Sequence, residues 1–363
     1  MADAWIEGRP AAFEAAVAEA ARLLSASRLP IIAGLGTDVA GARAAMKLAA
    51  QIDAVIDHMH AEWLLRDLDV AREAGMMVIT RAEAALIADT VLLIGPGLEA
   101  AGLDAELIDR PMPGDNATRR RVIRLCPEIP ARRRPDREIW VGNNRADLPG
   151  MLAALRATVA GRPCGRVREK STIEAVAAEL RRARFGVAAW SAAELDVLTI
   201  EMLCGLVDDL NRATRFSGLP LCATDQASGV LEVCGWLTGF PVRTGFRDGI
   251  PEHDPWRFSA PRLVESGEAD CVLWISAYGA VGPDWNEEIP LIALTGADTK
   301  FRRVPHVHMA VGKPGFDHDA VEHFARTGTL TYVQAKHRSE AIPVAAVIDA
   351  VRSQLRSNGA PLC

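Results

Sequence analysis

The sequence predicts an α/β protein built from two consecutive, mainly parallel, doubly wound lobes of similar plan. The strand ADTVLLIGPG at 88–97 has a counterpart, ADCVLWISAY, at 269–278. Each is preceded by a strand–helix–strand pattern and followed by another apolar strand, RRRVIRLC in one case and EIPLIALTG in the other. Buried strands that alternate with amphipathic helices are typical of a parallel sheet covered on both faces. The first lobe is expected over 1–160, including an Arg-rich segment at 115–137, and the second over 161–363.

The elements follow from periodicity and from start and stop signals. Apolar residues at helical spacing predict a first helix over 11–27, and Pro30 then opens the strand IIAGLG. Thr37 or Asp38 can cap the next helix. In the second half, Leu and Met residues spaced by three and four predict a helix near 194–213, and another helix closes the chain after Pro343.

The segment 223–258 has little regular pattern and is rich in Gly, Pro, Trp and Phe, which predicts a long loop. Its aromatic residues either stack on a flat cofactor or cement the loop or an interface, and the second role is the commoner one. They are Trp236, Phe240, Phe246, Trp256 and Phe258. We therefore expect the loop to face partner subunits.

Composition narrows the class of protein. The chain has 363 residues, 49% of them apolar, and a net charge of −6, which does not favour bulk nucleic-acid binding. Seven cysteines are scattered without a C-x-x-C pair, which argues against an iron–sulfur cluster, a zinc knuckle or a disulfide framework. The N-terminal residues do not read as a signal peptide and the apolar runs are strand-sized, so we expect a cytoplasmic protein.

The sequence patterns expected for dinucleotide binding, metal ligation and nucleophilic catalysis are incomplete in this chain. The turn GLGTDVAG has Gly34 and Gly36 where a dinucleotide fingerprint would have them, but Val39 stands where that fingerprint needs its third glycine. The pairs His58/His60 and His306/His308 lack a convincing third metal ligand, so polar strand ends are the better interpretation. No G-x-S-x-G elbow or cysteine in a glycine-rich turn indicates a nucleophile.

Eight arginines lie between residues 119 and 137 of an acidic protein. They are Arg119, Arg120, Arg121, Arg124, Arg132, Arg133, Arg134 and Arg137. Guanidinium groups pair bidentately with carboxylates, so the strip serves either a polyanion or an acidic partner, or forms a solvated face with ion pairs. The sequence leaves these interpretations open.

Two segments carry a resemblance to a known family. GWLTGFPVRTGFRDGIPEHDP at 235–255 and DLNRATRF at 209–216 resemble segments of the B subunit of formylmethanofuran dehydrogenase. The GLG turn followed by ARAAMKLAAQIDAVID resembles the segment leading to that family's active site, and the similarity covers roughly residues 5–310. The resemblance implies lobes of the molybdopterin-oxidoreductase type.

The departures from the family are informative. The family's cysteine-rich segment for an iron–sulfur cluster has no equivalent here. Where its redox members have an Asp-Asn-x-x-x-x-Cys-His run, this chain reads Asp57-His58-Met59-His60-Ala61-Glu62-Trp63-Leu64. Trp63 thus stands in place of the cysteine that ligates molybdenum or tungsten, and Leu64 in place of the histidine. An indole does not coordinate a metal as a thiolate does, so the resemblance implies a degenerate metal site plugged by Trp63.

Such a chain is similar to the B subunits of the formyltransferase/hydrolase complexes of methylotrophic bacteria. The resemblance implies a structural subunit with no catalytic residues and no redox cofactor of its own. Its partners would be the other three subunits: the hydrolase (A), the C component and the formyltransferase (D). Together these move a formyl group from tetrahydromethanopterin to a methanofuran-like carrier and release formate.

Because the family's carriers bear glutamate chains, six arginines are candidates for docking the polyglutamate arm. They are Arg119, Arg120, Arg121, Arg132, Arg133 and Arg134. The alternatives are an active molybdopterin or tungstopterin enzyme with an altered metal ligand, and a dinucleotide-binding protein akin to the middle domain of thiamine-diphosphate enzymes.

Overall fold

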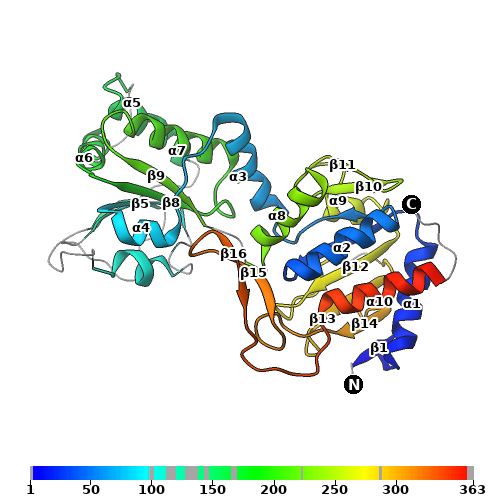
Figure 1. Cartoon of the computed structure of the whole chain (residues 1–363). Helices are drawn as coiled ribbons and strands as arrows, with labels where there is room; N and C mark the ends of the chain where they lie inside the picture. Colours follow the sequence, from blue (N-terminus) through cyan, green and yellow to red (C-terminus); the bar gives the residue numbers. More distant parts are fainter. Residues whose placement is uncertain are drawn as a thin grey trace. The chain divides into compact units, whose positions relative to one another are not determined.

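The chain folds into two compact units, each built around its own sheet. The computed structural model describes residues 3–96, 98, 102–111, 120–126, 138–142, 147–164, 170–221, 224–285 and 288–357. Unit 1 takes its residues from Met1–Ala61, Ala223–Phe324 and Leu330–Cys363, and unit 2 from Glu62–Cys222 and Ala325–Thr329. Unit 1 is therefore discontinuous in sequence, and unit 2 is inserted into it (Figure 1).

Unit 1 contains a sheet with the strand order β11-β10-β4-β3-β12-β13-β14-β1-β2. Its five central strands are parallel: β4 (Val55–Ile56), β3 (Pro30–Gly36), β12 (Cys271–Ser276), β13 (Leu291–Thr295) and β14 (Val307–Ala310). The antiparallel pairs β10 (Thr244–Arg247) with β11 (Ile250–His253) and β1 (Ala4–Ile6) with β2 (Arg9–Pro10) flank them. Counted along the chain, the parallel strands have the order 2-1-3-4-5, one of the two common doubly wound orders.

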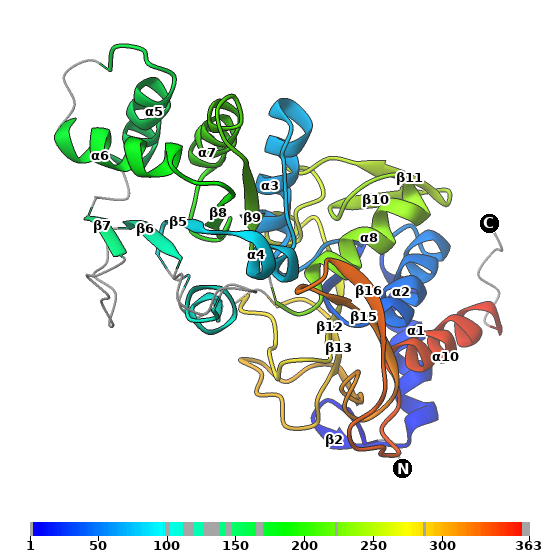
Figure 2. The same ribbon diagram turned by 60° about the vertical axis from the view of Figure 1, so that its left-hand side comes forward.

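Helices cover one face of this sheet and a mixed layer covers the other. Helices α1 (Phe13–Ala26), α2 (Val39–Gln51) and α10 (Val344–Ser357) lie together on one face (Figure 2). On the opposite face, α9 (Ala260–Glu265) packs its Leu263 and Val264 against Ile31, Val272 and Trp274. Helix α8 (Ala227–Thr238) also belongs to unit 1, and the strands β15 (Ala320–Phe324) and β16 (Thr329–Val333) form a two-stranded sheet.

Unit 2 has an all-parallel sheet with the order β7-β6-β5-β8-β9. The strands are β5 (Thr90–Ile94), β6 (Arg121–Cys126), β7 (Glu138–Gly142), β8 (Gly186–Trp190) and β9 (Phe216–Pro220). The helices are α3 (Ala61–Ala74), α4 (Arg81–Ile87), α5 (Leu148–Val159), α6 (Lys170–Arg181), α7 (Val197–Leu210) and a short π-helix at Asp104–Ile108. The order 3-2-1-4-5 is the other common doubly wound arrangement.

The α/β class and the presence of two mainly parallel, doubly wound sheets are confirmed. The two strands that the sequence identified as counterparts, β5 and β12, each occupy the middle position of a sheet. The expected boundary near residue 160 is wrong, because α5 and α6 on either side of it both belong to unit 2. The lobes are not consecutive, because β3 pairs with β12 and so brings residues near 30 beside residues near 271.

The expected long loop over 223–258 is also wrong. This segment contains α8 and the hairpin of β10 and β11. Helix α8 buries Val230, Val233 and Cys234 on one face and ends at Gly239, which adopts a left-handed conformation with φ +79°. The glycines that predicted a loop therefore lie inside or at the end of a helix. None of the helices in the described parts of the chain is long and apolar enough to cross a membrane.

Candidate functional site

In a doubly wound sheet, ligands bind at the carboxyl ends of the strands where the strand order reverses. In unit 1 this point lies between β3 and β12. Three segments meet there: the turn after β3, the turn after β12, and residues 57–60 after β4. We call this region the switch point of unit 1 and treat it as the candidate site.

The turn after β3 is shaped by close packing. Gly34 has a φ of +76°, and a Cβ built on it would lie 2.5 Å from the carbonyl oxygen of Ile275. Asp38 caps helix α2 by accepting a hydrogen bond from the backbone N–H of Gly41 at 3.0 Å. A carboxylate thus already occupies the positive end of the helix, where a dinucleotide would place its phosphates. The glycines of this turn serve strand packing, and the turn does not support the dinucleotide alternative.

A histidine–aspartate network joins the segment after β4 to the start of α8. His58 accepts a hydrogen bond on Nδ1 from the backbone N–H of His60 at 3.0 Å. Its Nε2–H therefore donates to the backbone carbonyl of Asp225 at 3.2 Å. Burial lowers the pKa of His58 to about 4, so its ring is neutral at pH 7.

The carboxylate of Asp225 receives the second histidine. Thr224 Oγ1 donates to Asp225 Oδ2 at 2.7 Å, and His60 Nε2 lies 3.2 Å from that carboxylate oxygen and 3.1 Å from the Thr224 hydroxyl. The hydrogen bond to His60 holds the pKa of Asp225 below its usual range. Asp225 and Gln226 both have left-handed backbones, with φ of 56° and 59°. Such conformations persist only where the surroundings hold them, as this network does.

Two further contacts close the switch point from the side of β15. Tyr278 donates its hydroxyl to Glu322 Oε1 at 2.8 Å, and burial raises the pKa of both groups. The amide of Gln226 accepts from the backbone N–H of His323 at 2.7 Å and donates to its carbonyl at 3.3 Å. The polar groups gathered here thus bond to one another.

The carboxylate of Asp57, the residue after β4, also bonds within unit 1. Its carboxylate accepts backbone hydrogen bonds from His58 at 2.9 Å and Ala260 at 2.8 Å, and Arg243 Nε lies 3.6 Å away. Burial raises the pKa of Asp57 to about 7, against the lowering effect of Arg243. The residue ties the end of β4 to the first residue of α9.

The expected site residues Trp63 and Leu64 lie on α3, in unit 2. Trp63 is half-buried and packs against the core of that unit, a cluster that includes Val70, Trp190 and Leu195. This gives the indole a packing role within its own unit.

The arginines of the Arg-rich strip differ in burial and in the groups that they bind. Arg119 and Arg132–Arg134 lie outside the described residues. Arg120 is 1% exposed and donates to the carbonyl oxygens of Ala85 at 2.5 Å, Ala88 at 2.8 Å and Arg110. Its guanidinium binds the end of helix α4 and is not available to a carrier.

Arg121, the next residue, is 40% exposed at its side chain and pairs with Glu179 at 3.0 Å. Arg124 forms a buried ion pair with Glu138 at 3.2 Å. Three adjacent or nearly adjacent arginines therefore have three different roles, and a count of arginines could not distinguish them.

The fold and this site define a class of protein: a doubly wound α/β chain of two units whose switch point in unit 1 is closed by its own side chains. No family model matches the chain. The B subunit of the formyltransferase/hydrolase complex of Methylorubrum extorquens is 32% identical over 98% of this chain and 99% of its own length. The crystal structure of that organism's formyltransferase/hydrolase complex with methylofuran contains a chain that matches with a TM-score of 0.89, 32% identity, and coverage of 99% of this chain and 100% of that one.

A more distant relative is the B subunit of the tungsten-containing formylmethanofuran dehydrogenase 2 of Methanocaldococcus jannaschii. It is 26% identical over 73% of this chain and 64% of its own length. The chain belongs to the family of formyltransferase/hydrolase complex B subunits. This confirms the resemblance found in the sequence.

The distant relative's name implies a tungsten centre, and three of the described cysteines lack the low thiol pKa that favours metal binding. Metal thiolates require a cysteine whose proton is readily lost. Burial raises the pKa of Cys204 to about 11 and that of Cys271 to about 12, and it raises the pKa of Cys234 further. Among the described residues no three His, Cys, Asp or Glu side chains are grouped to hold a metal ion.

Proposed function

We propose that this chain is a cytoplasmic, non-catalytic structural subunit of a formyltransferase/hydrolase complex. Its partners are the hydrolase (A), the C component and the formyltransferase (D). The assembly moves a formyl group from tetrahydromethanopterin to a methanofuran-like carrier and releases formate. This chain contributes a folded scaffold to that assembly and no reacting group.

The observation that carries the proposal is the match along nearly the whole length of both chains. The identity of 32% extends over 98% of this chain and 99% of the Methylorubrum protein, so both units take part in the likeness. The closed switch point supports the non-catalytic part. His58 is held neutral and bonded on both ring nitrogens, and Asp225 is paired, so neither is placed to exchange a proton with a substrate.

Exposed apolar side chains support the assembly part of the proposal. Trp256 is 71% exposed, Ile250 69% and Trp236 50%, all within the segment 223–258 of unit 1. Large apolar side chains that gather on a surface mark sites of contact with other chains. We propose that this segment faces partner subunits, as expected from the sequence.

The test is purification of the native complex through a tag on this chain. Molybdenum, tungsten and iron per copy are measured by elemental mass spectrometry, and formate release from a formylated carrier is measured on the same sample. We expect co-purified A, C and D subunits, formate release, and no stoichiometric redox metal. Molybdenum or tungsten at one per copy would instead establish the alternative of an active pterin enzyme.

We also propose that the exposed arginines of the strip hold the glutamate arm of the carrier. The described support is Arg121, whose side chain is 40% exposed beside β6. Because Arg120 stabilises α4, it is left unchanged in the test, and Arg119, Arg121 and Arg132–Arg134 are replaced by Gln together. Carrier retention should fall while the complex stays assembled, and the matched control is Arg184→Gln, at a side chain that is 88% exposed. Unchanged carrier retention would end this proposal.

A further inference from the structure

The chain passes between unit 1 and unit 2 four times. It leaves unit 1 at Ala61 and returns at Ala223, then leaves again at Phe324 and returns at Leu330. Segments that join two compact units are usually exposed, flexible linkers that make few contacts. In this chain, described residues beside all four passages are bonded to one another. We call the segments 57–61, 224–226, 320–324 and 330–333 of unit 1 the crossing segments.

The first two crossing segments are joined through Asp225. His60 Nε2 lies 3.2 Å from the Asp225 carboxylate, and the Nε2–H of His58 donates to the Asp225 backbone carbonyl at 3.2 Å. These contacts have little access to water, since the side chains of His60 and Asp225 are 16% and 17% exposed and His58 is 3% exposed. A hydrogen bond is stronger where water is excluded. The segment that leaves unit 1 is thus bound to the segment that returns.

The second and third crossing segments are joined through Gln226. Its side-chain amide accepts from the backbone N–H of His323 at 2.7 Å and donates to the carbonyl of the same residue at 3.3 Å. The ring of His323 also lies 3.7 Å from the carboxylate of Glu232 on α8. Strands β15 and β16 then pair with each other, which joins the third segment to the fourth (Figure 2). Hydrogen bonds therefore connect all four crossing segments in series.

The backbone of the second crossing segment links these ties to each other. Asp225 and Gln226 are consecutive residues other than glycine, and both have left-handed backbones, with φ of 56° and 59°. Residues with a Cβ hold this conformation only where their surroundings impose it. The two side chains bind different neighbouring segments, so loss of either bond frees this backbone to relax and weakens the other bond. We therefore expect the two ties to open together.

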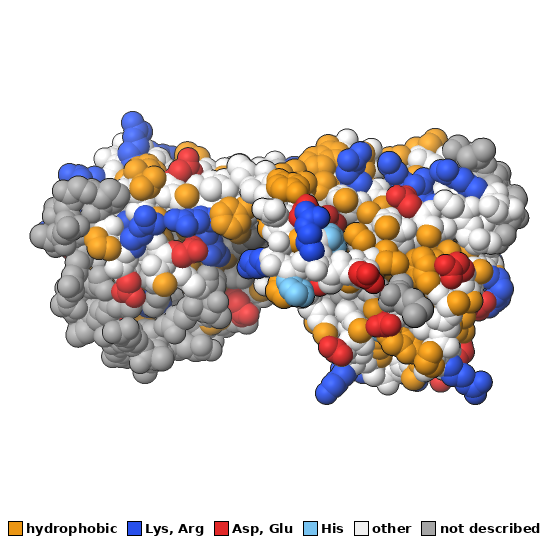
Figure 3. Space-filling model, turned by 60° about the horizontal axis from the view of Figure 1, so that its bottom comes forward, with side chains coloured by type: hydrophobic (Ala, Val, Ile, Leu, Met, Phe, Trp, Pro, Cys, Tyr) orange, Lys and Arg blue, Asp and Glu red, His pale blue; other side chains and the backbone are white. Residues whose placement is uncertain are grey.

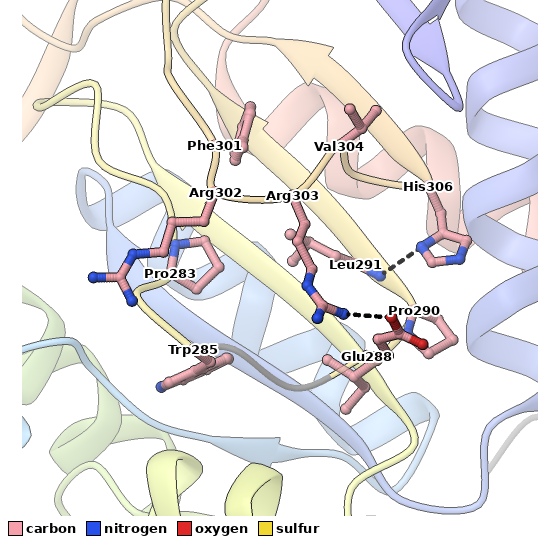
Figure 4. A pocket seen from close by; sticks show the side chains of 11 residues that line it. Pro283, Trp285, Glu288, Pro290, Leu291, Phe301, Arg302, Arg303, Val304 and His306 are labelled. Atoms are coloured by element: carbon pink, nitrogen blue, oxygen red, sulfur yellow. Dashed lines mark hydrogen bonds and ion pairs between the residues drawn. The ribbon is translucent and has the colours of Figure 1, made fainter.

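Other features of unit 1 do not select one class of ligand among the described residues. A cavity of about 440 Å³ is lined by Trp285 and Phe301, and Figure 4 shows that Arg303 at its edge pairs with Glu288, at 3.1 Å. On the face of unit 1 in the right half of Figure 3, hydrophobic side chains lie between acidic and basic ones. The crossing segments, by contrast, have defined partners within the chain.

We propose that the crossing segments form one cooperative clamp, which makes the passages to the inserted unit 2 a fixed junction in place of a hinge. A hinge needs a few residues that are free to change their backbone angles, and the bonds of His60, Asp225 and Gln226 remove that freedom. A chain with such a junction has less conformational entropy to lose when it assembles with other chains. The inference goes beyond the proposed function and holds whichever partner the chain binds.

The experiment is hydrogen exchange, measured by mass spectrometry on the full chain within its purified complex. In the wild-type protein, peptides that cover residues 57–61, 224–230 and 320–324 should share one opening free energy as urea is added at low concentration. His60→Ala removes a ring contact of the first tie, yet it should speed exchange in 320–324 by about 5- to 10-fold. Gln226→Ala removes the second tie and should speed exchange in 57–61 by a similar factor.

The matched control is His306→Ala. The ring of His306 also bonds to a backbone group, the N–H of Leu291 at 3.3 Å, but it joins the amino ends of β13 and β14 (Figure 4). This variant should leave exchange in all three peptides unchanged. Different opening free energies for the three wild-type peptides, or variants that speed exchange only in their own segment, would overturn the inference. The wild-type measurement needs no substitution, so it tests the inference even if a variant does not fold.

Discussion

The replacement of Arg120 by Met tests whether the Arg-rich strip is a docking surface or part of the fold. Arg120 is buried, and its guanidinium donates to the carbonyl oxygens of Ala85, Ala88 and Arg110. Two of these carbonyls belong to the last turn and C-cap of α4. Carbonyls at the end of a helix have no partner within the helix and need one from elsewhere. Met fills a similar volume and offers no donor.

The magnitude follows from the three hydrogen bonds. Hydrogen bonds from a charged donor contribute about 1.5–3 kcal/mol each, but the contributions are not additive. Burial of the guanidinium, which lowers the pKa of Arg120, opposes them. We expect Arg120→Met to lower the free energy of unfolding of unit 2 by about 3 kcal/mol. For a unit of this size that corresponds to about 6–12 °C in Tm.

The assay is thermal and urea unfolding of the complex, followed by carrier retention on the folded protein. Arg121→Met is the control for the unfolding measurements only, because exposed ion pairs such as Arg121 with Glu179 contribute about 0–1 kcal/mol. If Arg120→Met left Tm unchanged while carrier was lost, the guanidinium would face the carrier and our interpretation of its three contacts would be refuted.

Two further predictions concern the interiors of the two units. Burial raises the pKa of Asp67 to about 6 from 3.8, so the native state keeps its proton longer than the unfolded state, and stability falls as pH rises from about 4 to 6. The side chain of Asn in Asp67→Asn still accepts the hydrogen bond from Trp190 Nε1 but does not titrate. In urea unfolding, the free energy of unfolding of this variant should no longer fall between about pH 4 and 6, and at pH 7 it should exceed the wild-type value by up to about 3 kcal/mol. A pH dependence equal to that of the wild type would contradict this. Gly34→Ala should destabilise unit 1 by about 2–4 kcal/mol, because its Cβ would meet the Ile275 carbonyl, whereas Gly75→Ala has the same φ of +76° in open space and should cost about 1 kcal/mol. Equal losses of unfolding free energy in the two variants would show that the close approach of Gly34 to the Ile275 carbonyl does not matter.

Much of the fold was predictable because the signals are local. The spacing of apolar residues predicted α1, α7 and α10 within a few residues, and the matching strands predicted two similar sheets. The pairing of β3 with β12 was not predictable, since nothing near residue 30 specifies a partner near 271. Helix α8 was missed because glycines at 229, 235 and 239 outweighed the buried spacing of its apolar residues.

The candidate site was also predictable only in part. The sequence placed polar residues at 57–60 in the segment that corresponds to the family's active site, and the structure joins this segment to the start of α8 through His60 and Asp225. That His58 would bond to the backbone of Asp225 depends on where α8 starts, which the sequence did not predict. The role of Arg120 was also out of reach, because neighbouring residues at a strand point to opposite sides and only the fold shows which side is the interior.

The central strands of unit 1 show how a fold can be kept while the side chains at the carboxyl ends of its strands change. The core is fixed by residues such as Ile32, Leu273 and Ile292, which are at most 3% exposed and take no part in the switch point. Side chains at the carboxyl ends can therefore be exchanged, and closed on one another as His60 and Asp225 are, without loss of the sheet.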